Sequence, residues 1–383
     1  MADFYVEIGL SCLPKYTEEL CGDTVRTTTD EHSVVSVVSD GLGSGVKASI
    51  LSTLTTSIAS RMFTAGVSLE DMMETISATL PMCRERKIAY ATLTAIEIRR
   101  TGQAFLAEFD APGALLLRDL QPVRLERTPR RVGQRPLTIN EAHFWMQEND
   151  YLVCVTDGVI HAGIGAKLAL GLGEAGLQEF LQARLTPNMT AQEVADRITE
   201  YVHYLYNGKP GDDATTLVLK IRKPKRLMVL VGPPKDRALD KALAHKLAYY
   251  PGTKVVCGGT TAKLVARELG RQIEIDLEQF PVEHPPTGQI EGIDLVTEGI
   301  ITLCGAAQFL ENKNQDHQED SPAVLLGQML LASDYIDFHV GGAINPAHQN
   351  PELPFDLALK QQVVNKIAAA LAHRGKRVQV QLY

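Results

Sequence analysis

The stretch VVSDGLGSGVKAS, residues 37–49, constrains the fold of this chain more than any other feature. A β-branched apolar run stops at Asp40, and three glycines follow within five residues before a helical pattern begins. Apolar residues then recur every four positions, at Val46, Ile50, Leu54 and Ile58. Leu51 and Met62 widen this apolar stripe, and the spacing predicts an amphipathic helix. A carboxylate and bare backbone therefore lie between a strand and a helix.

Length and charge limit the class of protein. A chain of 383 residues is long enough for two domains, each with its own core. The net charge of −8, with acids and bases interspersed, argues against a nucleic-acid partner. No apolar run approaches the roughly 20 residues that span a bilayer, and the N-terminal stretch carries an acid where a signal peptide is basic. With no C-x-x-C pair, the expectation is a reduced, cytoplasmic protein without a membrane partner.

The chain divides near residue 225, where a basic, proline-containing stretch separates two apolar runs. Before it, strands in hairpins alternate with grouped helices, which predicts an α+β domain over residues 1–222. After it, strand and helix patterns alternate from "RLMVLVGPP" to "QIEID". This alternation predicts a second α/β domain, residues 226–383, with a mostly parallel sheet.

Four acids stand at strand ends. Asp40 and Asp157 each end an apolar run and precede a glycine, Asp23 follows Gly22, and Asp212 lies just before the last strand of the first domain. Acids at strand ends can meet at one rim of a sheet, and their oxygens suit Mg²⁺ or Mn²⁺. A glycine after the acid leaves the main-chain carbonyl open to a ligand. The competing interpretation is that each Asp-Gly pair marks a turn.

Other glycine and nucleophile motifs do not fit. The glycines after Asp40 lack the G-x-x-G spacing that completes a dinucleotide fingerprint, and Lys47 does not complete a P-loop. The chain has no G-x-S-x-G elbow and no histidine-rich metal spacing.

In combination, the motifs "VVSDGLGSGVKAS", "LVCVTDGVIHAG" and "GDDATTLVLKI" resemble the metal-dependent protein phosphatases of the 2C type, in their bacterial SpoIIE-like branch. "DAPGALLLRD" resembles a further stretch of that branch, and the resemblance covers about residues 1–222. It implies a β-sandwich flanked by helices and two Mn²⁺ or Mg²⁺ ions. It also implies hydrolysis of phosphoserine or phosphothreonine by a metal-activated water.

The resemblance assigns roles residue by residue. Asp40 would bridge both ions, and the Gly41 carbonyl would bind one of them. Asp157 would contact the centre, Asp212 would complete the second ion's shell, and Asp23 would act through metal-bound water. Asp213 falls where relatives often carry Asn or Asp, and it is a second-ranked candidate for the site after these acids.

Two positions depart from the family pattern. Many relatives have an acid where this chain has His161, which would either protonate the leaving alkoxide or lie on the surface. The arginine that grips phosphate in eukaryotic relatives has no recognisable counterpart near the N-terminus.

In the second domain, an apolar run enters Gly258 and Gly259, and Thr260 or Thr261 then opens a helix. A glycine turn before a helix leaves backbone N–H groups free and favours an anion. The alternative is an ordinary capped helix after a tight turn.

The sequence therefore predicts a metal-dependent protein-serine/threonine phosphatase whose C-terminal domain regulates it or selects its target. The substrate would be a phosphorylated protein, by analogy an anti-anti-sigma-like factor, and a homodimer is a further expectation. Two alternatives are a catalytically weak phosphoprotein-binding module and a hydrolase of a small phosphorylated metabolite.

Overall fold

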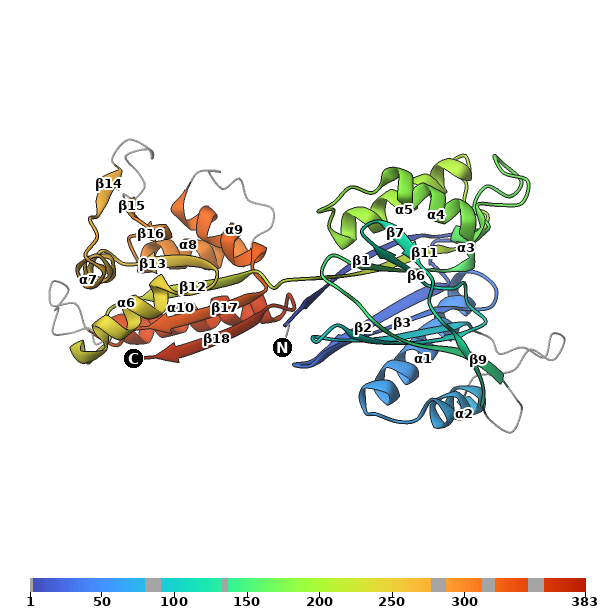
Figure 1. Cartoon of the computed structure of the whole chain (residues 1–383), viewed down its shortest axis with the longest axis horizontal. Coiled ribbons are helices and arrows are strands. Elements are labelled where there is room, and N and C mark those ends of the chain that lie inside the picture. The colour runs from blue at the N-terminus through green and yellow to red at the C-terminus, as the bar shows by residue number, and fades with distance from the viewer. Residues whose placement is uncertain (1–2, 80–90, 133–136, 277–286, 312–320, 344–354) are drawn as a thin grey trace. The chain divides into compact units, whose positions relative to one another are not determined.

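The computed structural model describes residues 3–79, 91–132, 137–276, 287–311, 321–343 and 355–383. The chain splits into two compact units, Met1–Lys223 and Pro224–Tyr383. In Figure 1 the first unit runs from blue to yellow-green and the second from yellow to red. Among the helices in the described ranges, none combines the length and apolar character that a membrane crossing needs.

The first unit is built on two sheets in which neighbouring strands pair antiparallel. The five-stranded sheet has the order β1 (Tyr5–Leu13), β11 (Ala214–Arg222), β10 (Tyr151–Val155), β6 (Leu115–Arg118) and β7 (Gln121–Val123). The six-stranded sheet has the order β2 (Asp23–Thr29), β3 (Ser33–Asp40), β4 (Leu93–Arg99), β5 (Gln103–Phe109), β9 (Leu137–Trp145) and β8 (Thr128–Val132).

Helices cover the outer face of each sheet (Figure 1). Against the six-stranded sheet lie α1 (Gly45–Thr64) and α2 (Leu69–Thr79). Against the five-stranded sheet lie α3 (Asp157–Ile160), α4 (Gly173–Arg184) and α5 (Ala191–Leu205). Strands such as β10 are buried along their whole length because both faces of the sheet are covered. The predicted β-sandwich flanked by helices is confirmed.

Helix α1 forms where the periodicity predicted it, but only part of the predicted apolar stripe faces the core, namely Leu51, Ile58 and Met62. Val46, Ile50 and Leu54 have 61%, 54% and 44% of their surface exposed, while the small residues Ala48 and Ser52 are fully buried. Hydroxyl groups make this close contact with β2. The Thr24 and Ser52 hydroxyls lie 2.7 Å apart, and those of Thr28 and Ser60 lie 3.0 Å apart. Short side chains let the helix approach β2 closely, and Val46, Ile50 and Leu54 are left on its exposed side.

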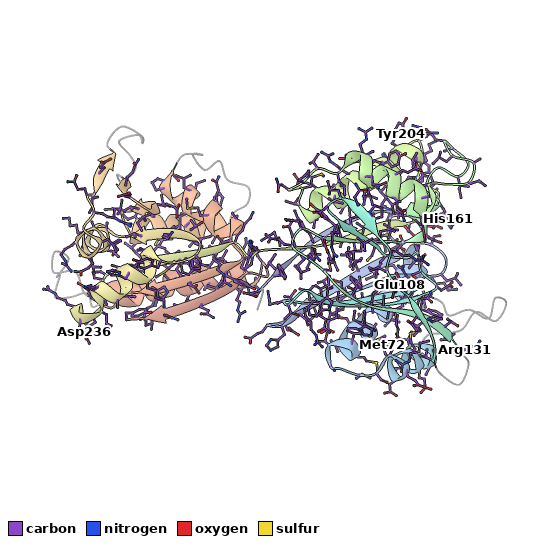
Figure 2. The ribbon with its side chains drawn as sticks, in the orientation of Figure 1. Met72, Glu108, Arg131, His161, Tyr204 and Asp236 are labelled. Carbon is purple, nitrogen blue, oxygen red and sulfur yellow. The ribbon has the colours of Figure 1, made fainter. Side chains whose placement is uncertain are left out.

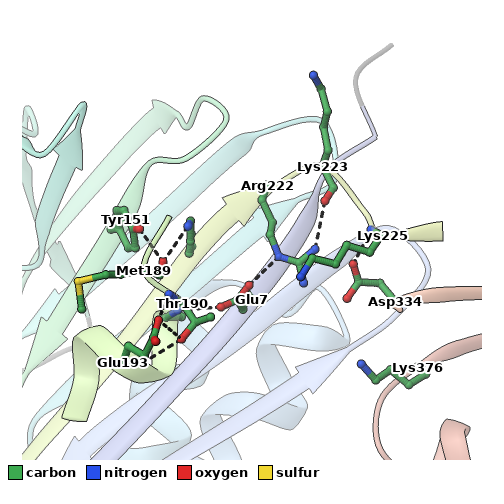
Figure 3. Close-up of polar contacts among 12 residues, drawn as sticks. Glu7, Tyr151, Met189, Thr190, Glu193, Arg222, Lys223, Lys225, Asp334 and Lys376 are labelled. Atoms are coloured by element: carbon green, nitrogen blue, oxygen red, sulfur yellow. Dashed lines mark hydrogen bonds and ion pairs between the residues drawn. The ribbon is translucent and has the colours of Figure 1, made fainter. Parts of the chain in front are cut away.

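Charged groups join the start of α5 to the two neighbouring strands (Figure 3). Glu7 in β1 accepts a hydrogen bond from the Arg222 guanidinium at 2.6 Å and another from the backbone N–H of Ala191 at 2.8 Å. Thr190 and Glu193 form a reciprocal capping box that begins α5. These bonds fix α5 over the five-stranded sheet.

The second unit has one seven-stranded sheet between two layers of helices. Its order is β14 (Glu274–Asp276), β15 (Thr287–Ile290), β16 (Ile293–Thr297), β13 (Thr253–Cys257), β12 (Arg226–Val231), β17 (Tyr335–Val340) and β18 (Arg377–Leu382). The five strands from β16 to β18 pair parallel, and β14 and β15 add an antiparallel edge. The predicted α/β unit with a mostly parallel sheet is confirmed.

Two apolar clusters lie on opposite faces of this sheet. The first involves α8 (Ile300–Glu311), α9 (Pro322–Ala332) and α10 (Phe355–Ala372). The second involves α6 (Asp240–Ala248) and α7 (Gly259–Leu269), preceded by the short 3₁₀ helix η1 (Arg237–Leu239). Side chains alternate along β12, with Val229 in the first cluster and Met228 in the second.

One buried ion pair in the first unit yields a stability prediction. Glu108, labelled in Figure 2, is 3% exposed and accepts a hydrogen bond from the Arg127 guanidinium at 2.6 Å. Arg127→Leu leaves this carboxylate without its charged partner, so we expect a loss of about 3 kcal/mol in the free energy of unfolding. Urea unfolding followed by the fluorescence of Trp145, the one tryptophan of the chain, measures this unit.

The matched control is Arg130→Leu. Arg130 pairs with Glu141 at 3.2 Å, but its side chain is 46% exposed, so this variant should lose less than about 1 kcal/mol. Equal losses in the two variants would contradict the assignment of a stabilising role to the buried pair.

Candidate metal centre

Two of the four predicted acids face each other across one strand pair. Asp23 is the first residue of β2 and Asp40 the last residue of β3, and the antiparallel register pairs them directly. The backbone of Asp40 is fixed by Thr92, whose hydroxyl accepts the Asp40 N–H at 3.0 Å and whose N–H donates to the Asp40 carbonyl at 2.9 Å. Neighbouring side chains on one face of such a pair lie about 5 Å apart. The strand ends therefore hold two carboxylates side by side.

The other two acids come from the five-stranded sheet. Asp157 begins α3, directly after β10, and Asp212 lies two residues before β11, which pairs antiparallel with β10. The carboxyl end of β10 and the amino end of β11 therefore lie at the same edge. The acids thus come from the ends of four strands, two in each sheet.

Thr156 joins the two sheets at this edge. Its hydroxyl donates to Asp23 Oδ2 at 2.8 Å and accepts the backbone N–H of Thr215 at 2.8 Å. Thr156 is 3% exposed, so these bonds form away from water, where a polar group without a partner would be costly. Sequence reasoning missed Thr156, although it precedes Asp157 in the T-D-G motif.

Burial and neighbouring charges raise the pKa values of three of the acids. Burial, followed by the charges of Asp23, Asp157 and Asp212, raises the pKa of Asp40 to about 9. Burial is also the largest cause that raises the pKa of Asp23, to about 6. Burial and then the charge of Asp157 raise the pKa of Asp212. A cation relieves such repulsion between carboxylates, so this edge favours one.

The donor atoms suit a hard divalent cation. The carboxylate oxygens of this edge are of the type that Mg²⁺ and Mn²⁺ prefer, and the buried Asp23 Oδ1 has no hydrogen-bond partner among the described residues. With the side chains as they lie, no group of three or more His, Cys, Asp or Glu in the described ranges is arranged to hold a metal ion. The chemistry of the residues fits such a metal.

Glycines at this edge allow close backbone contacts. A Cβ on Gly41 would collide with the carbonyl oxygen of Ala48 in α1, and a Cβ on Gly158 would collide with the carbonyl oxygen of Asp213. Gly43 and Gly45 have φ values of +110° and +65°, which L-residues with a Cβ rarely adopt. Gly41 therefore has a packing role besides the carbonyl role that the family resemblance implies.

Asp213 and His161 differ from the four acids. Asp213 is 4% exposed and accepts the backbone N–H of Lys15 at 2.9 Å, so it fixes the adjoining loop. The side chain of His161, labelled in Figure 2, is 53% exposed, and its Nδ1 lies 3.9 Å from Asp157 Oδ2. Its position one helical turn after Asp157 accounts for this contact.

Further groups near the acids were not indicated by the sequence. The Tyr206 hydroxyl donates to the Gly158 carbonyl at 3.0 Å and supports the start of α3. Cys12 and Cys21 place their sulfur atoms 2.6 Å apart, and the Thr215 hydroxyl donates to Cys12 at 3.3 Å. Both cysteines lie beside Thr215, since Cys12 is its partner in the β1–β11 pair and Cys21 Sγ lies 3.8 Å from its hydroxyl oxygen.

Comparison with known proteins identifies a family for the part of the chain that carries the acids. The family model for Stage II sporulation protein E (SpoIIE) matches residues 30–222, which include three of the four acids. No curated protein matches the chain.

Solved structures similar to this chain include the phosphatase domain of the cell fate determinant SpoIIE from Bacillus subtilis. It is 19% identical, with a TM-score of 0.45, and the match covers 58% of this chain and 95% of that one. A B. subtilis structure of the PP2C phosphatase domain with a regulatory fragment is 19% identical, with a TM-score of 0.49 and coverage of 57% and 64%. RsbX in complex with magnesium is 16% identical, with a TM-score of 0.41 and coverage of 56% and 95%.

A helix-flanked sandwich of two antiparallel sheets, with acids at one edge, is the architecture of the first unit. The family model matches residues 30–222, which is half of the whole chain, so this chain belongs to the SpoIIE family.

The mutual repulsion of the acids yields a prediction for metal-free protein. The pKa of Asp40 is about 9 in the folded state and 3.8 in the unfolded state. The contribution of Asp40 to the free energy of unfolding is therefore fully present below pH 3.8 and is lost as the pH rises toward 9, because the folded protein resists ionisation of this group. Asp40→Asn removes the penalty. In EDTA, its midpoint of urea unfolding should rise above that of the parent protein between pH 5 and pH 8, by an increasing margin.

The control is Asp196→Asn, at an exposed position of α5. Its midpoint should follow the parent protein at every pH. A constant difference for Asp40→Asn across this range, or a loss of stability that grows with pH, would contradict the electrostatic account of the four acids.

Proposed function

We propose that this protein is a metal-dependent phosphatase that removes phosphate from phosphoserine or phosphothreonine in a protein substrate. The observation that carries the proposal is the arrangement of Asp23, Asp40, Asp157 and Asp212 at the ends of four strands of two sheets. Membership of the SpoIIE family supports it.

In this proposal, Asp40, Asp157 and Asp212 hold two Mn²⁺ or Mg²⁺ ions together with the Gly41 carbonyl. Such ions supply an activated water and neutralise phosphoryl charge. The Asp40 backbone is held in place, because its N–H and its carbonyl both bond to Thr92, directly before β4. Asp23 Oδ2 is occupied by the Thr156 hydroxyl, which leaves Oδ1 to orient a water. Asp213 keeps the loop before β11 in place through Lys15.

The substrate and the second unit complete the proposal. A phosphorylated protein, by analogy with the family an anti-anti-sigma-like factor, would supply the phosphoserine or phosphothreonine. Residues 224–383 form a compact unit of their own, which we assign to regulation or target selection. Two alternatives are hydrolysis of a small phosphorylated metabolite and phosphoprotein binding without turnover. The assays below distinguish them.

Turnover by the full-length protein tests the proposal. With Mn²⁺, the protein should hydrolyse both p-nitrophenyl phosphate and a phosphoserine peptide, and EDTA should abolish both activities. Asp40→Asn and Asp157→Asn should each lower kcat at least about 100-fold, equivalent to roughly 3 kcal/mol in the barrier, because an amide supplies no negative charge to a cation. Asp196→Asn serves as the control and should retain parent activity.

Other outcomes have defined meanings. Unchanged kcat in either centre variant at saturating Mn²⁺ would contradict the metal assignment. No turnover with any metal would favour the binding module, and turnover of small phosphates with none of the peptide would favour a metabolite hydrolase.

The exposed position of His161 leads to a separate prediction. A serine alkoxide needs a proton to leave, whereas p-nitrophenolate does not, so a general acid is recognised by a selective loss on the peptide. With its side chain 53% exposed and 3.9 Å from Asp157, His161 is a surface residue, and His161→Ala should change kcat/KM for both substrates by less than about threefold. A loss confined to the phosphoserine peptide would instead make His161 the general acid.

A further inference from the structure

The second unit contains a cleft at the carboxyl ends of its parallel strands. Counted from β12, its parallel strands lie in the order third, second, first, fourth and fifth, so the order reverses between β12 and β17. In open α/β sheets, ligands bind outside the carboxyl ends of the strands at such a reversal. A cavity of about 420 Å³ lies there, lined by residues that follow β12, β13, β16 and β17. This volume is in the range of small-molecule sites.

Glycines shape the loops that border the cleft. Gly232, Gly258 and Gly299 follow β12, β13 and β16 and have φ values of +77°, +115° and +134°. The Gly258 N–H also donates to the carbonyl of Thr297, the last residue of the neighbouring strand β16, at 2.8 Å. Three successive strands thus each end in a conformation that favours glycine, and this keeps side chains away from the rim.

The N-terminus of α7 opens onto this cleft. Gly258 occupies the N-cap position and has no side chain to accept the first N–H groups of the helix. Thr261 lines the cleft, is 1% exposed, and uses its hydroxyl to donate to the Cys257 carbonyl at 3.3 Å. Gly259 has no heavy atom within 4 Å of the place where a Cβ would lie, so this position borders open space. Backbone N–H groups at a helix start favour an anion.

The charges around the cleft are mainly positive. Two acids, Asp240 and Glu298, line it together with five basic residues: Lys235, Arg237, Lys263, Arg267 and Lys360. Arg267 already bonds to Asp240 and Glu268, at 2.7 and 2.8 Å. The remaining excess of basic side chains lies on the same rim as the start of α7, which strengthens the attraction for an anion.

A buried acceptor in the cleft requires a second kind of group on the ligand. Asp240 is 7% exposed, and its Oδ2 accepts the Arg267 bond, but its Oδ1 is buried without a hydrogen-bond partner in the described part of the chain. Buried polar atoms are nearly always paired, and an orphaned carboxylate oxygen calls for a donor. A hydroxyl or amino group of a ligand would supply it.

We propose that this cleft binds a small hydroxylated phosphate ester, of the nucleoside phosphate or sugar phosphate class. Its phosphate lies at the start of α7 near Gly259 and Lys263, and one of its hydroxyl groups donates to Asp240 Oδ1. The site is independent of the acids of the first unit and does not depend on the function proposed for them. It extends the anion site predicted at Gly258, Gly259, Thr260 and Thr261 to a ligand of defined chemistry.

Calorimetric titration of the full-length protein tests this inference. The probes are inorganic phosphate, ribose 5-phosphate, AMP and ATP, in EDTA so that a metal-dependent phosphate site cannot contribute. At least one ester should bind with one site per chain, at least about tenfold more tightly than inorganic phosphate, because only the esters carry a sugar hydroxyl that reaches Asp240 while the phosphate lies at the start of α7. Comparison of ribose 5-phosphate with AMP and ATP distinguishes sugar phosphates from nucleotides.

Two variants locate the binding in this cleft. Gly259→Val fills open space without touching other protein atoms and should weaken ester binding at least about tenfold. Lys263→Gln removes a lining charge and should weaken it about threefold or more. Lys241→Gln, in α6 but not among the lining residues, should bind as the parent protein does.

Three results would overturn the proposal. These are no binding of any ester to the parent protein, ester binding unaffected by both cleft variants, and inorganic phosphate bound as tightly as the esters. A phosphoserine peptide that binds in the cleft while the small esters do not would assign the site to a protein segment and would also overturn it.

Discussion

The hydrogen bond from Thr156 to Asp23 is the contact on which the candidate centre depends. Asp23 belongs to the six-stranded sheet, whereas Thr156 and Thr215 belong to the end of the other sheet, so one buried hydroxyl joins both layers at the edge that carries the acids. Apolar packing between the sheets is non-directional and fixes their separation more than their alignment. A buried directional bond adds alignment, because shifting either sheet would leave a carboxylate oxygen and a hydroxyl unpaired in a dry interior. The position of Asp40 and Asp157 relative to each other follows from it.

Much of this architecture follows from the sequence, and the failures have physical causes. Asp23, Asp40, Asp157 and Asp212 could be singled out because a glycine or a strand end adjoins each acid, and those signals are local. Thr156 and the Lys15 N–H could not, since their roles depend on pairing between segments far apart in the chain. The exposed part of the α1 stripe has a different origin. Helical periodicity assumes that all large apolar residues face the core, whereas much of the buried face of α1 consists of small and hydroxyl-bearing residues beside Leu51.

The second unit shows the same contrast. Strand and helix alternation predicted its parallel sheet, but α9 was not recognised, because its residues are apolar on nearly every side and give no amphipathic period. The glycine turn before α7 was visible in the sequence as a local motif. Its neighbours in the cleft were not, since Lys235 and Asp240 come from the segment that runs from β12 into the first residue of α6, and Lys360 comes from α10. Local motifs thus locate the start of a site, and topology supplies the rest of its lining.

The hairpin that joins β2 to β3 gives the acid pair an unexpected sensitivity to chain length. Its turn is closed by Asp30, whose Oδ1 accepts the backbone N–H groups of His32 and Ser33 at 2.6 and 2.7 Å. From that turn the register runs through seven residue pairs to Asp23 opposite Asp40. An inserted residue in the turn that displaced the register by one would send one of the two carboxylates to the opposite face of the sheet. Surface loops usually tolerate insertions, but this one sets the alignment of side chains at the far end of the hairpin.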